Sequence, residues 1–171
     1  MEEKRISFPI DDETISGLKA GEKVLISGKI FCGRDMVLPK IVKMIEDGSI
    51  EDAPFSLKGS LIFHTAVSRA GVGPTSSNKY EIESTMETLS KAGVKMHLGK
   101  GELSKKTAEI LSENNAVFAV IPPVTALLND RTKAQKVVAF KELGMEAFYE
   151  LEVEDFPAVI AIASGESIYD R

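Results

Sequence analysis

The stretch Lys23-Val24-Leu25-Ile26-Ser27-Gly28-Lys29-Ile30 decides the fold class of this chain, because its apolar run is typical of a buried β-strand. Gly33-Arg34-Asp35 follows as a loop. Apolar residues then recur at helical spacing from Met36 to Ile45, and the pattern ends near Gly48. A strand, a short loop and a helix in this order are typical of an α/β fold. Sheets of that class bind ligands at the carboxyl ends of their strands, where the Arg34 loop stands.

The same alternation of strand and helix continues through the middle of the chain. The sequence predicts further strands at 60–66, 94–98 and 116–121. Helices are expected at 78–92, from a Ser104 cap to about Glu113, and over 126–129. Strands predominate at the two ends, at 5–10, 136–140, 147–153 and 158–163, with turn and helix-start residues at 11–21 and a turn-like tail after Ser164. We therefore expect a compact α/β domain with a mixed sheet, in one layer or split into two.

The composition excludes several classes of protein. Hydrophobic residues make up 43% of the 171 residues and charged residues 27%, which is typical of a soluble globular chain. The net charge of −5, with the lysines scattered, argues against a nucleic-acid binder, which usually has a basic face. No apolar run approaches the roughly 20 residues of a membrane span, and no signal-like region follows the first residues. The expected location is therefore the cytoplasm.

Cysteine and histidine are scarce, which limits the chemistry that the chain can perform. Cys32 is the only cysteine, so an internal disulfide and a cluster held by this chain's own thiolates are excluded. It can line a site near Arg34, but a small buried apolar role is the expectation. His64 and His97 are the only histidines and stand far apart in the sequence. We therefore do not expect them to form a metal-binding site. His64 is expected at a half-buried position in a strand.

A second informative stretch is Val72-Gly73-Pro74-Thr75-Ser76-Ser77-Asn78-Lys79. A Gly-Pro turn precedes three hydroxyl residues, an amide and a lysine, and an amphipathic segment begins just after them. Thr75, Ser76 and Ser77 are thus predicted at a helix N-terminus, where backbone N–H groups and the helix dipole attract an anion. One hydroxyl is enough for a helix cap. The stretch is either an ordinary helix start or a binding site for a small carboxylate or phosphate.

Three cations follow three predicted strands, and in a parallel sheet they would meet at one edge. Arg34 follows the first strand, Lys79 comes after the Thr75 loop, and Lys100 lies between two glycines. Together they suit a dicarboxylate, because Arg grips a carboxylate with two parallel bonds and Lys supplies a point charge. Taken singly, Arg34 can be an ion pair with Asp35, Lys79 a helix surface charge and Lys100 a solvated turn. Their shared position at strand ends favours the site.

Five strings of this sequence resemble, in order, the successive motifs of one family. The strings are Ser27-Gly28-Lys29-Ile30-Phe31-Cys32-Gly33-Arg34-Asp35, Gly73-Pro74-Thr75-Ser76, Gly99-Lys100-Gly101, Glu142-Leu143-Gly144-Met145-Glu146-Ala147 and Leu151-Glu152-Val153-Glu154-Asp155-Phe156-Pro157-Ala158. The family that they resemble comprises the β subunits, or C-terminal domains, of class I iron–sulfur fumarate hydratases, with L-tartrate dehydratase as a near relative. The resemblance covers about 23–163. It implies a single swivelling β/β/α-type domain over 1–171, with an N-terminal arm at 1–22 and a tail at 164–171.

The resemblance also implies a partner and a set of roles. A separate α subunit would carry a [4Fe–4S] cluster on three cysteines, with an iron acting as Lewis acid. By motif position, Thr75 would be the base that takes a proton from carbon. Arg34, Lys79 and Lys100 would hold the substrate carboxylates, and Ser76 is a further substrate-binding candidate. A threonine is a poor base, so a group from the partner would have to lower its pKa.

The chain departs from the family pattern at several positions. Leu38 stands where the family has a histidine, Lys79 replaces an arginine, and Pro122-Pro123 replaces a Gly-Gly pair. The leading hypothesis is the β subunit of a hydro-lyase that interconverts fumarate and (S)-malate and is active only with its α subunit. The alternatives are a related dehydratase acting on tartrate or another hydroxy acid, and a non-catalytic binding or assembly domain.

Overall fold

The computed structural model describes residues 3–68, 71–75, 79–121 and 125–170. Within them the larger sheet has eight strands, namely β1 (Lys4–Phe8), β2 (Lys23–Cys32), β3 (Ser60–Phe63), β6 (Val94–Gly99), β7 (Val117–Val120), β8 (Thr132–Ala139), β9 (Phe148–Ala163) and β10 (Glu166–Ser167). A hairpin of β4 (Thr65–Ser68) and β5 (Gly71–Thr75) forms a second sheet. The helices are α1 (Asp12–Ser16), α2 (Leu38–Asp47), α3 (Lys79–Lys91), α4 (Lys105–Glu113) and α5 (Thr125–Asp130), with 3₁₀ turns η1 (Ser49–Asp52), η2 (Lys141–Glu146) and η3 (Ile168–Asp170).

The larger sheet is mixed, so the predicted α/β class with a mixed sheet is confirmed. Strands β1, β2, β3, β6 and β7 are parallel to one another, whereas β9 runs antiparallel to β2, β7, β8 and β10. Because β9 pairs with both β7 and β2, the five strands β2, β3, β6, β7 and β9 close on themselves. Closure leaves these strands without a free edge along which another chain could pair.

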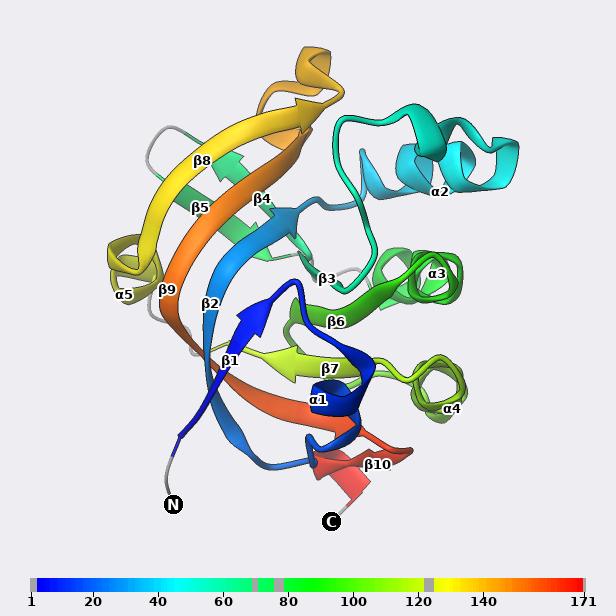
Figure 1. The fold of residues 1–171 in the computed structure, drawn as a ribbon, viewed down its shortest axis with the longest axis vertical. Coiled ribbons are helices and arrows are strands. Elements are labelled where there is room, and N and C mark those ends of the chain that lie inside the picture. The colour runs from blue at the N-terminus through cyan, green and yellow to red at the C-terminus, as the bar shows by residue number, and fades with distance from the viewer. Residues whose placement is uncertain (1–2, 69–70, 76–78, 122–124, 171) are drawn as a thin grey trace.

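Strand β9 differs from the sequence prediction, which placed two strands at 147–153 and 158–163. The structure has one continuous strand of 16 residues, which arcs along β2 in Figure 1. The polar interruption at Glu154–Asp155 is an irregularity within it: Asp155 has a φ of 51°, and the register with β2 shifts between Ile26 and Gly28. Such a bulge bends a strand without ending it. Gly28 is required there, because a Cβ at its φ of 104° would lie 2.3 Å from the carbonyl oxygen of Phe8.

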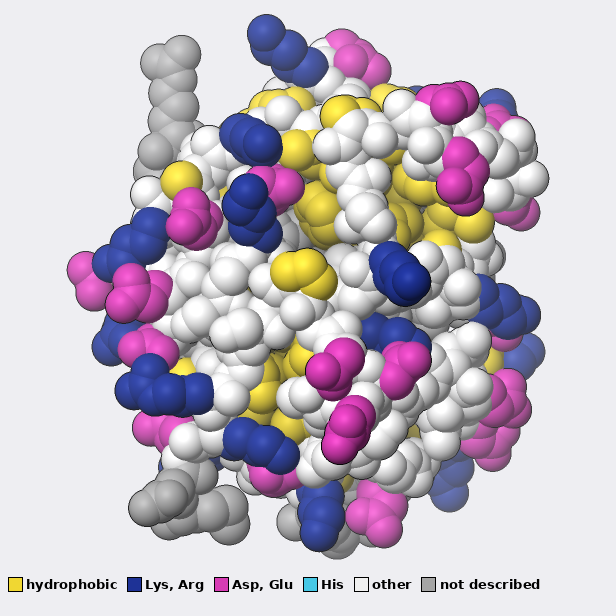
Figure 2. All heavy atoms as spheres, viewed as in Figure 1, with side chains coloured by type: hydrophobic (Ala, Val, Ile, Leu, Met, Phe, Trp, Pro, Cys, Tyr) yellow, Lys and Arg dark blue, Asp and Glu magenta, His cyan; other side chains and the backbone are white. Residues whose placement is uncertain are grey.

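Apolar side chains fill the space on both sides of the closed sheet. The main core cluster draws on β1, β2, β3, β6, β7 and β9, and includes Ile26, Phe63, Met96 and Phe156. Figure 1 shows α2, α3 and α4 covering one flank of the sheet. Two further clusters lie beneath these helices, one around Ile41 and Leu89 and one around Met86 and Leu111. No helix among the described residues is long and apolar enough to cross a membrane. Acidic and basic side chains are interspersed over the face of the molecule that Figure 2 shows.

The predicted helix boundaries agree closely with the structure. Helix α3 matches the expected 78–92, and α4 begins at the predicted Ser104 cap, whose Oγ accepts a hydrogen bond from the Thr107 N–H at 3.2 Å. Helix α2 ends at Gly48, whose φ of 82° is the left-handed conformation common after a helix. Local sequence signals were sufficient here because each helix carries its own start or stop residue.

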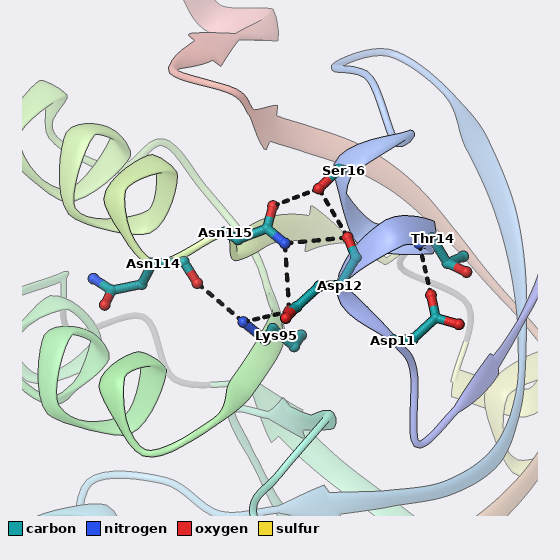
Figure 3. Close-up of polar contacts among 7 residues, drawn as sticks. All are labelled: Asp11, Asp12, Thr14, Ser16, Lys95, Asn114 and Asn115. Carbon is teal, nitrogen blue, oxygen red and sulfur yellow. Dashed lines mark hydrogen bonds and ion pairs between the residues drawn. The ribbon is translucent and has the colours of Figure 1, made fainter.

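The segment before β2 is fastened to the domain by polar contacts that Figure 3 shows. Asp12 of α1 forms an ion pair with Lys95 of β6 at 2.8 Å, and the Lys95 Nζ donates to the Asn114 carbonyl at 3.2 Å. The Asn115 side chain accepts from the Ser16 hydroxyl at 3.0 Å and donates to the Asp12 carbonyl at 3.1 Å. Helix α1 is thus held against β6 and the end of α4, while β1 pairs with β2 in the sheet.

Candidate functional site

The parallel strands β2, β3 and β6 end at the same edge of the sheet. Cys32 pairs with Phe63, and Phe63 pairs with Leu98, so these three residues form one row across the strands. The next row continues the ladder, because Gly33 N–H donates to the Phe63 carbonyl at 3.0 Å and His64 N–H donates to the Leu98 carbonyl at 2.9 Å. The loops that follow the three strands therefore leave the sheet side by side.

Two of the predicted cations stand on this edge. Arg34 comes two residues after Cys32, and Lys100 comes two residues after Leu98. With β3 between β2 and β6, the backbones of Cys32 and Leu98 at the ends of these strands are about 10 Å apart, since neighbouring strands are spaced by about 4.8 Å. The Lys100 side chain is exposed, and Gly101 beside it has a φ of 85°. The edge thus carries two basic side chains, those of Arg34 and Lys100.

Arg34 is held by Glu146, which comes from the 3₁₀ turn η2. The guanidinium Nε donates to the two Glu146 carboxylate oxygens at 3.0 and 3.4 Å, and Nη2 donates to Oε1 as well. Both side chains are about one quarter exposed, 27% for Arg34 and 22% for Glu146. The Glu146 carboxylate raises the pKa of Arg34, chiefly through these hydrogen bonds. The pair fixes the orientation of a guanidinium that is otherwise on a flexible stem.

The sequence prediction did not identify Glu146 as a site residue. In the sequence, Glu146 belongs only to the family string Glu142-Leu143-Gly144-Met145-Glu146-Ala147, and Asp35 is the expected ion-pair partner of Arg34 if Arg34 is not a site residue. Arg34 and Glu146 are 112 residues apart, so no local spacing rule connects them. A signal was nevertheless present, because a charged residue in a short string between two strands often faces a site.

Thr75 is a strand residue, which corrects the expectation that it starts a helix. It is the last residue of β5 and pairs with Thr65 of β4, whereas α3 begins only at Lys79. The expected Gly73-Pro74 turn lies inside β5, where the register shifts between Thr65 and Val67. An edge strand with a bulge tolerates a proline, which has no N–H for the ladder.

The remaining two candidates are placed only in part. The backbone of Lys79 opens helix α3. Ser76, with Ser77 and Asn78, lies outside the described residues, so the anion-binding loop stays a prediction. Because β3 leads through His64 into the β4–β5 hairpin, Thr75 is connected to the same edge of the sheet as Arg34 and Lys100.

The two histidines, which are far apart in the sequence, lie side by side in the structure. His64 Nε2 and His97 Nδ1 are 3.0 Å apart, and His97 Nε2 lies 3.0 Å from the Ser90 hydroxyl of α3. His64 is fully buried rather than half-buried, with 1% of its surface exposed. The expected strand over 60–66 divides here into β3 and β4. These hydrogen bonds connect the end of β3, strand β6 and helix α3 near the sheet edge at which Arg34 and Lys100 lie.

The buried histidine pair makes the stability of the protein depend on pH. Burial lowers the pKa of His64 to about 4 and that of His97 well below 6.5. The unfolded chain therefore binds more protons than the folded chain below pH 6.5, so stability is lost as the pH falls from 6.5 toward 4. Each neutral histidine contributes a loss of about 1.4 kcal/mol per pH unit in that range.

We expect His97→Gln to make the acid-dependent loss of stability less steep. Urea unfolding at pH 7, 6 and 5 measures it, and the variant should lose less free energy of unfolding between pH 6 and 5 than the unmodified chain. Each protein is compared with its own free energy of unfolding at pH 7. Proton binding determines how this free energy changes with pH, whereas other effects of the substitution shift it equally at every pH. An unchanged slope would mean that His97 is already protonated in the folded protein.

Cys32 is buried, so its thiol is not accessible to solvent or to a ligand. It is 0% exposed, and burial raises the pKa of its thiol far above the ordinary value. The expected buried position is therefore confirmed. Iron–sulfur clusters are held by cysteine thiolates, so this side chain does not fit one. Among the described residues, no group of three or more His, Cys, Asp or Glu could hold a metal ion.

Comparison with known proteins gives a consistent set of relatives. The family model described as Fumarase C-terminus matches residues 2–171. The chain is 32% identical to the putative L(+)-tartrate dehydratase subunit beta of Methanocaldococcus jannaschii, over 92% of this chain and 86% of that protein. It is 32% identical to the putative fumarate hydratase class I of Geobacillus stearothermophilus, over 96% of this chain and 33% of that protein. It is 29% identical to fumarate hydratase 2 of Leishmania major, over 95% of this chain and 30% of that protein.

The lengths covered differ between the two kinds of relative. The chain spans about one third of the fumarate hydratases that it matches and most of the tartrate dehydratase β subunits. The L(+)-tartrate dehydratase subunit beta of Escherichia coli follows the second pattern, with 27% identity over 93% of this chain and 82% of that protein.

Proposed function

Because this chain belongs to the Fumarase C-terminus family, we propose that it is the β subunit of a two-subunit hydro-lyase that hydrates fumarate to (S)-malate reversibly. The family match over residues 2–171 carries this proposal. The relatives bear names of hydro-lyases, and those matched over most of their length are named as β subunits. A cytoplasmic location and a hetero-oligomer with an α subunit belong to the same proposal.

The residues of this chain would bind and orient the substrate. Arg34 and Lys100 supply positive charge at one edge of the sheet, and Lys79 opens the helix that follows the Thr75 strand. A dicarboxylate has two anionic ends, so two separated cations favour it over a substrate with one carboxylate. The Ser76 hydroxyl, next to Thr75 in the sequence, would form a further hydrogen bond with the substrate.

The reaction needs a proton acceptor at carbon. In the dehydration direction Thr75 Oγ, after giving its own proton to a group of the α subunit, would take the proton from the carbon next to the one that carries the hydroxyl. The C–H electron pair then forms the double bond, and the C–O bond breaks with loss of hydroxide, so that the sum is water. A [4Fe–4S] cluster on the α subunit would supply a Lewis acid for the departing hydroxyl. This chain does not hold the cluster, because Cys32 is buried and alone.

Tartrate is the second candidate substrate. The relatives that this chain matches over 86% and 82% of their length are named as tartrate dehydratase subunits, whereas the fumarate hydratases are matched over about a third. A tartrate carries a second hydroxyl, so its recognition would require one more hydrogen-bond partner than malate does.

Anaerobic co-expression with the candidate α subunit tests the proposal. After iron–sulfur reconstitution, an ultraviolet assay follows the loss of fumarate, and a parallel assay follows the dehydration of tartrate. We expect activity that requires both chains. Activity on tartrate but not on fumarate would make tartrate the substrate. If an intact complex acts on no hydroxy acid, the chain would be a non-catalytic binding or assembly domain.

A further inference from the structure

Glu83 of helix α3 binds the start of helix α4 through a single carboxylate oxygen. Its Oε1 accepts hydrogen bonds from the Ser104 N–H at 2.7 Å, the Ser104 hydroxyl at 2.7 Å and the Thr107 hydroxyl at 2.5 Å. Figure 1 shows α3 and α4 side by side on the same flank of the sheet, and they are in contact. A carboxylate at a helix N-terminus is favoured by the helix dipole.

These contacts exceed what the cap of α4 requires. Ser104 already caps the helix by itself, because its Oγ accepts from the Thr107 N–H at 3.2 Å. Glu83 adds a charged acceptor from a different helix, and hydrogen bonds to ionised groups are roughly twice as strong as neutral ones. Glu83 thus connects α3 to the N-terminus of α4, where the loop from β6 ends.

That loop carries Lys100 and is fixed at both ends. At its start, Gly99 still belongs to β6, and its carbonyl accepts from the Ile121 N–H at 3.4 Å. At its end stands Ser104, bound by Glu83, and Leu103 before it is buried in the cluster under α3 and α4. Only 100–102 lie between the β6 ladder and this buried end. The Glu83 contact thus acts on one end of a loop of only three residues, the first of which is Lys100.

Helix α3 also begins with Lys79, one turn before Glu83. We propose that Glu83 is a positioning residue, which holds the Lys100 loop on α3 and so sets the spacing between the two lysines that bind the substrate carboxylates. This inference rests on the proposed function. Fumarate is a rigid trans dicarboxylate, so it cannot adapt to a changed distance between the cations that receive its two ends.

The test uses Glu83→Gln in the complex with the α subunit. We expect the KM for fumarate to rise about tenfold while kcat changes less than threefold, because a misplaced carboxylate-binding residue weakens substrate and transition state alike. Glu87→Gln is the matched control: Glu87 lies one turn further along α3, is half exposed and pairs with Lys91 at 3.4 Å. Its KM should stay at the unmodified value.

A double variant separates positioning from general stability. If Glu83 acts through Lys100, the Glu83→Gln change should alter the KM less than twofold in a Lys100→Gln background. Equal effects in both backgrounds would overturn the inference. Thr107→Val removes one of the three hydrogen bonds while conserving shape, and a smaller rise of KM is expected from it. An unchanged KM in both Glu83→Gln and Thr107→Val would also overturn it.

Hydrogen exchange keeps this test separate from the proposed function. In Glu83→Gln the Ser104 and Thr107 amides should exchange faster than in the unmodified complex, whether or not the complex has activity. If the unmodified complex shows no hydro-lyase activity, the proposed function fails. The exchange rates then still decide whether Glu83 fixes the loop, and equal rates in the two proteins would exclude it.

Discussion

Replacing Thr75 by valine is expected to lower the kcat of the complex by about a thousandfold, within the range of roughly 10²–10⁴ that general acid–base catalysis supplies. Valine keeps the shape and the β-branched backbone preference of threonine, and Thr75 is the last residue of strand β5. The hairpin and the assembly with the α subunit should therefore survive, while the proton acceptor is lost. Steady-state kinetics of fumarate hydration measure the change.

Thr75→Ser is the control, because serine retains the hydroxyl and should keep a substantial part of the turnover. Size-exclusion chromatography of each variant with the α subunit separates lost chemistry from lost assembly. Normal turnover of the valine variant would remove Thr75 from the mechanism. Equal loss in the serine and valine variants would point instead to the backbone of the β4–β5 hairpin.

Arg34→Met is expected to lower kcat/KM by about two to three orders of magnitude, which corresponds to roughly 3–4 kcal/mol of transition-state binding. Two effects add. The substrate loses a guanidinium that can bind a carboxylate through two parallel hydrogen bonds. The Glu146 carboxylate loses the guanidinium that now neutralises its charge. An uncompensated carboxylate near the substrate repels an anion.

Two further variants separate these effects. Arg34→Lys keeps the charge but not the fork geometry, so an intermediate loss is expected. The double variant Arg34→Met with Glu146→Gln removes the repulsion and should recover part of kcat/KM, but not all of it. Full recovery would mean that Arg34 serves only to neutralise Glu146. The urea midpoint of each variant reports how much of the loss is due to stability.

Local sequence signals predicted the secondary structure well wherever an element carries its own boundary residues. The apolar run before Arg34 became β2, and Ser104 and Gly48 mark helix ends in the structure as they do in the sequence. Periodicity reports which residues of an element are buried, and a strand that is buried on both faces, such as β3, has a continuous apolar run. The predicted mixed α/β sheet followed from the order of these elements.

The partners of the site residues could not be predicted in the same way. Asp155 interrupts the apolar pattern of β9, yet the strand continues through it because β2 carries a matching irregularity at Gly28. Thr75 lies in a strand because Thr65 pairs with it, although Gly-Pro is a common sign of a turn. Each outcome depends on a neighbouring strand that is remote in the sequence.

The alternation of strands and helices through the middle of the chain, the placement of Arg34 and Lys100 just after strand ends and the family resemblance all follow from the amino-acid sequence. That Glu146 holds Arg34, that His64 meets His97 and that Glu83 binds the end of the Lys100 loop is visible only in the folded chain. The physical reason is the range of the interactions. Periodicity and capping act within a few residues, whereas these hydrogen bonds join residues that the closed sheet and its helices bring together.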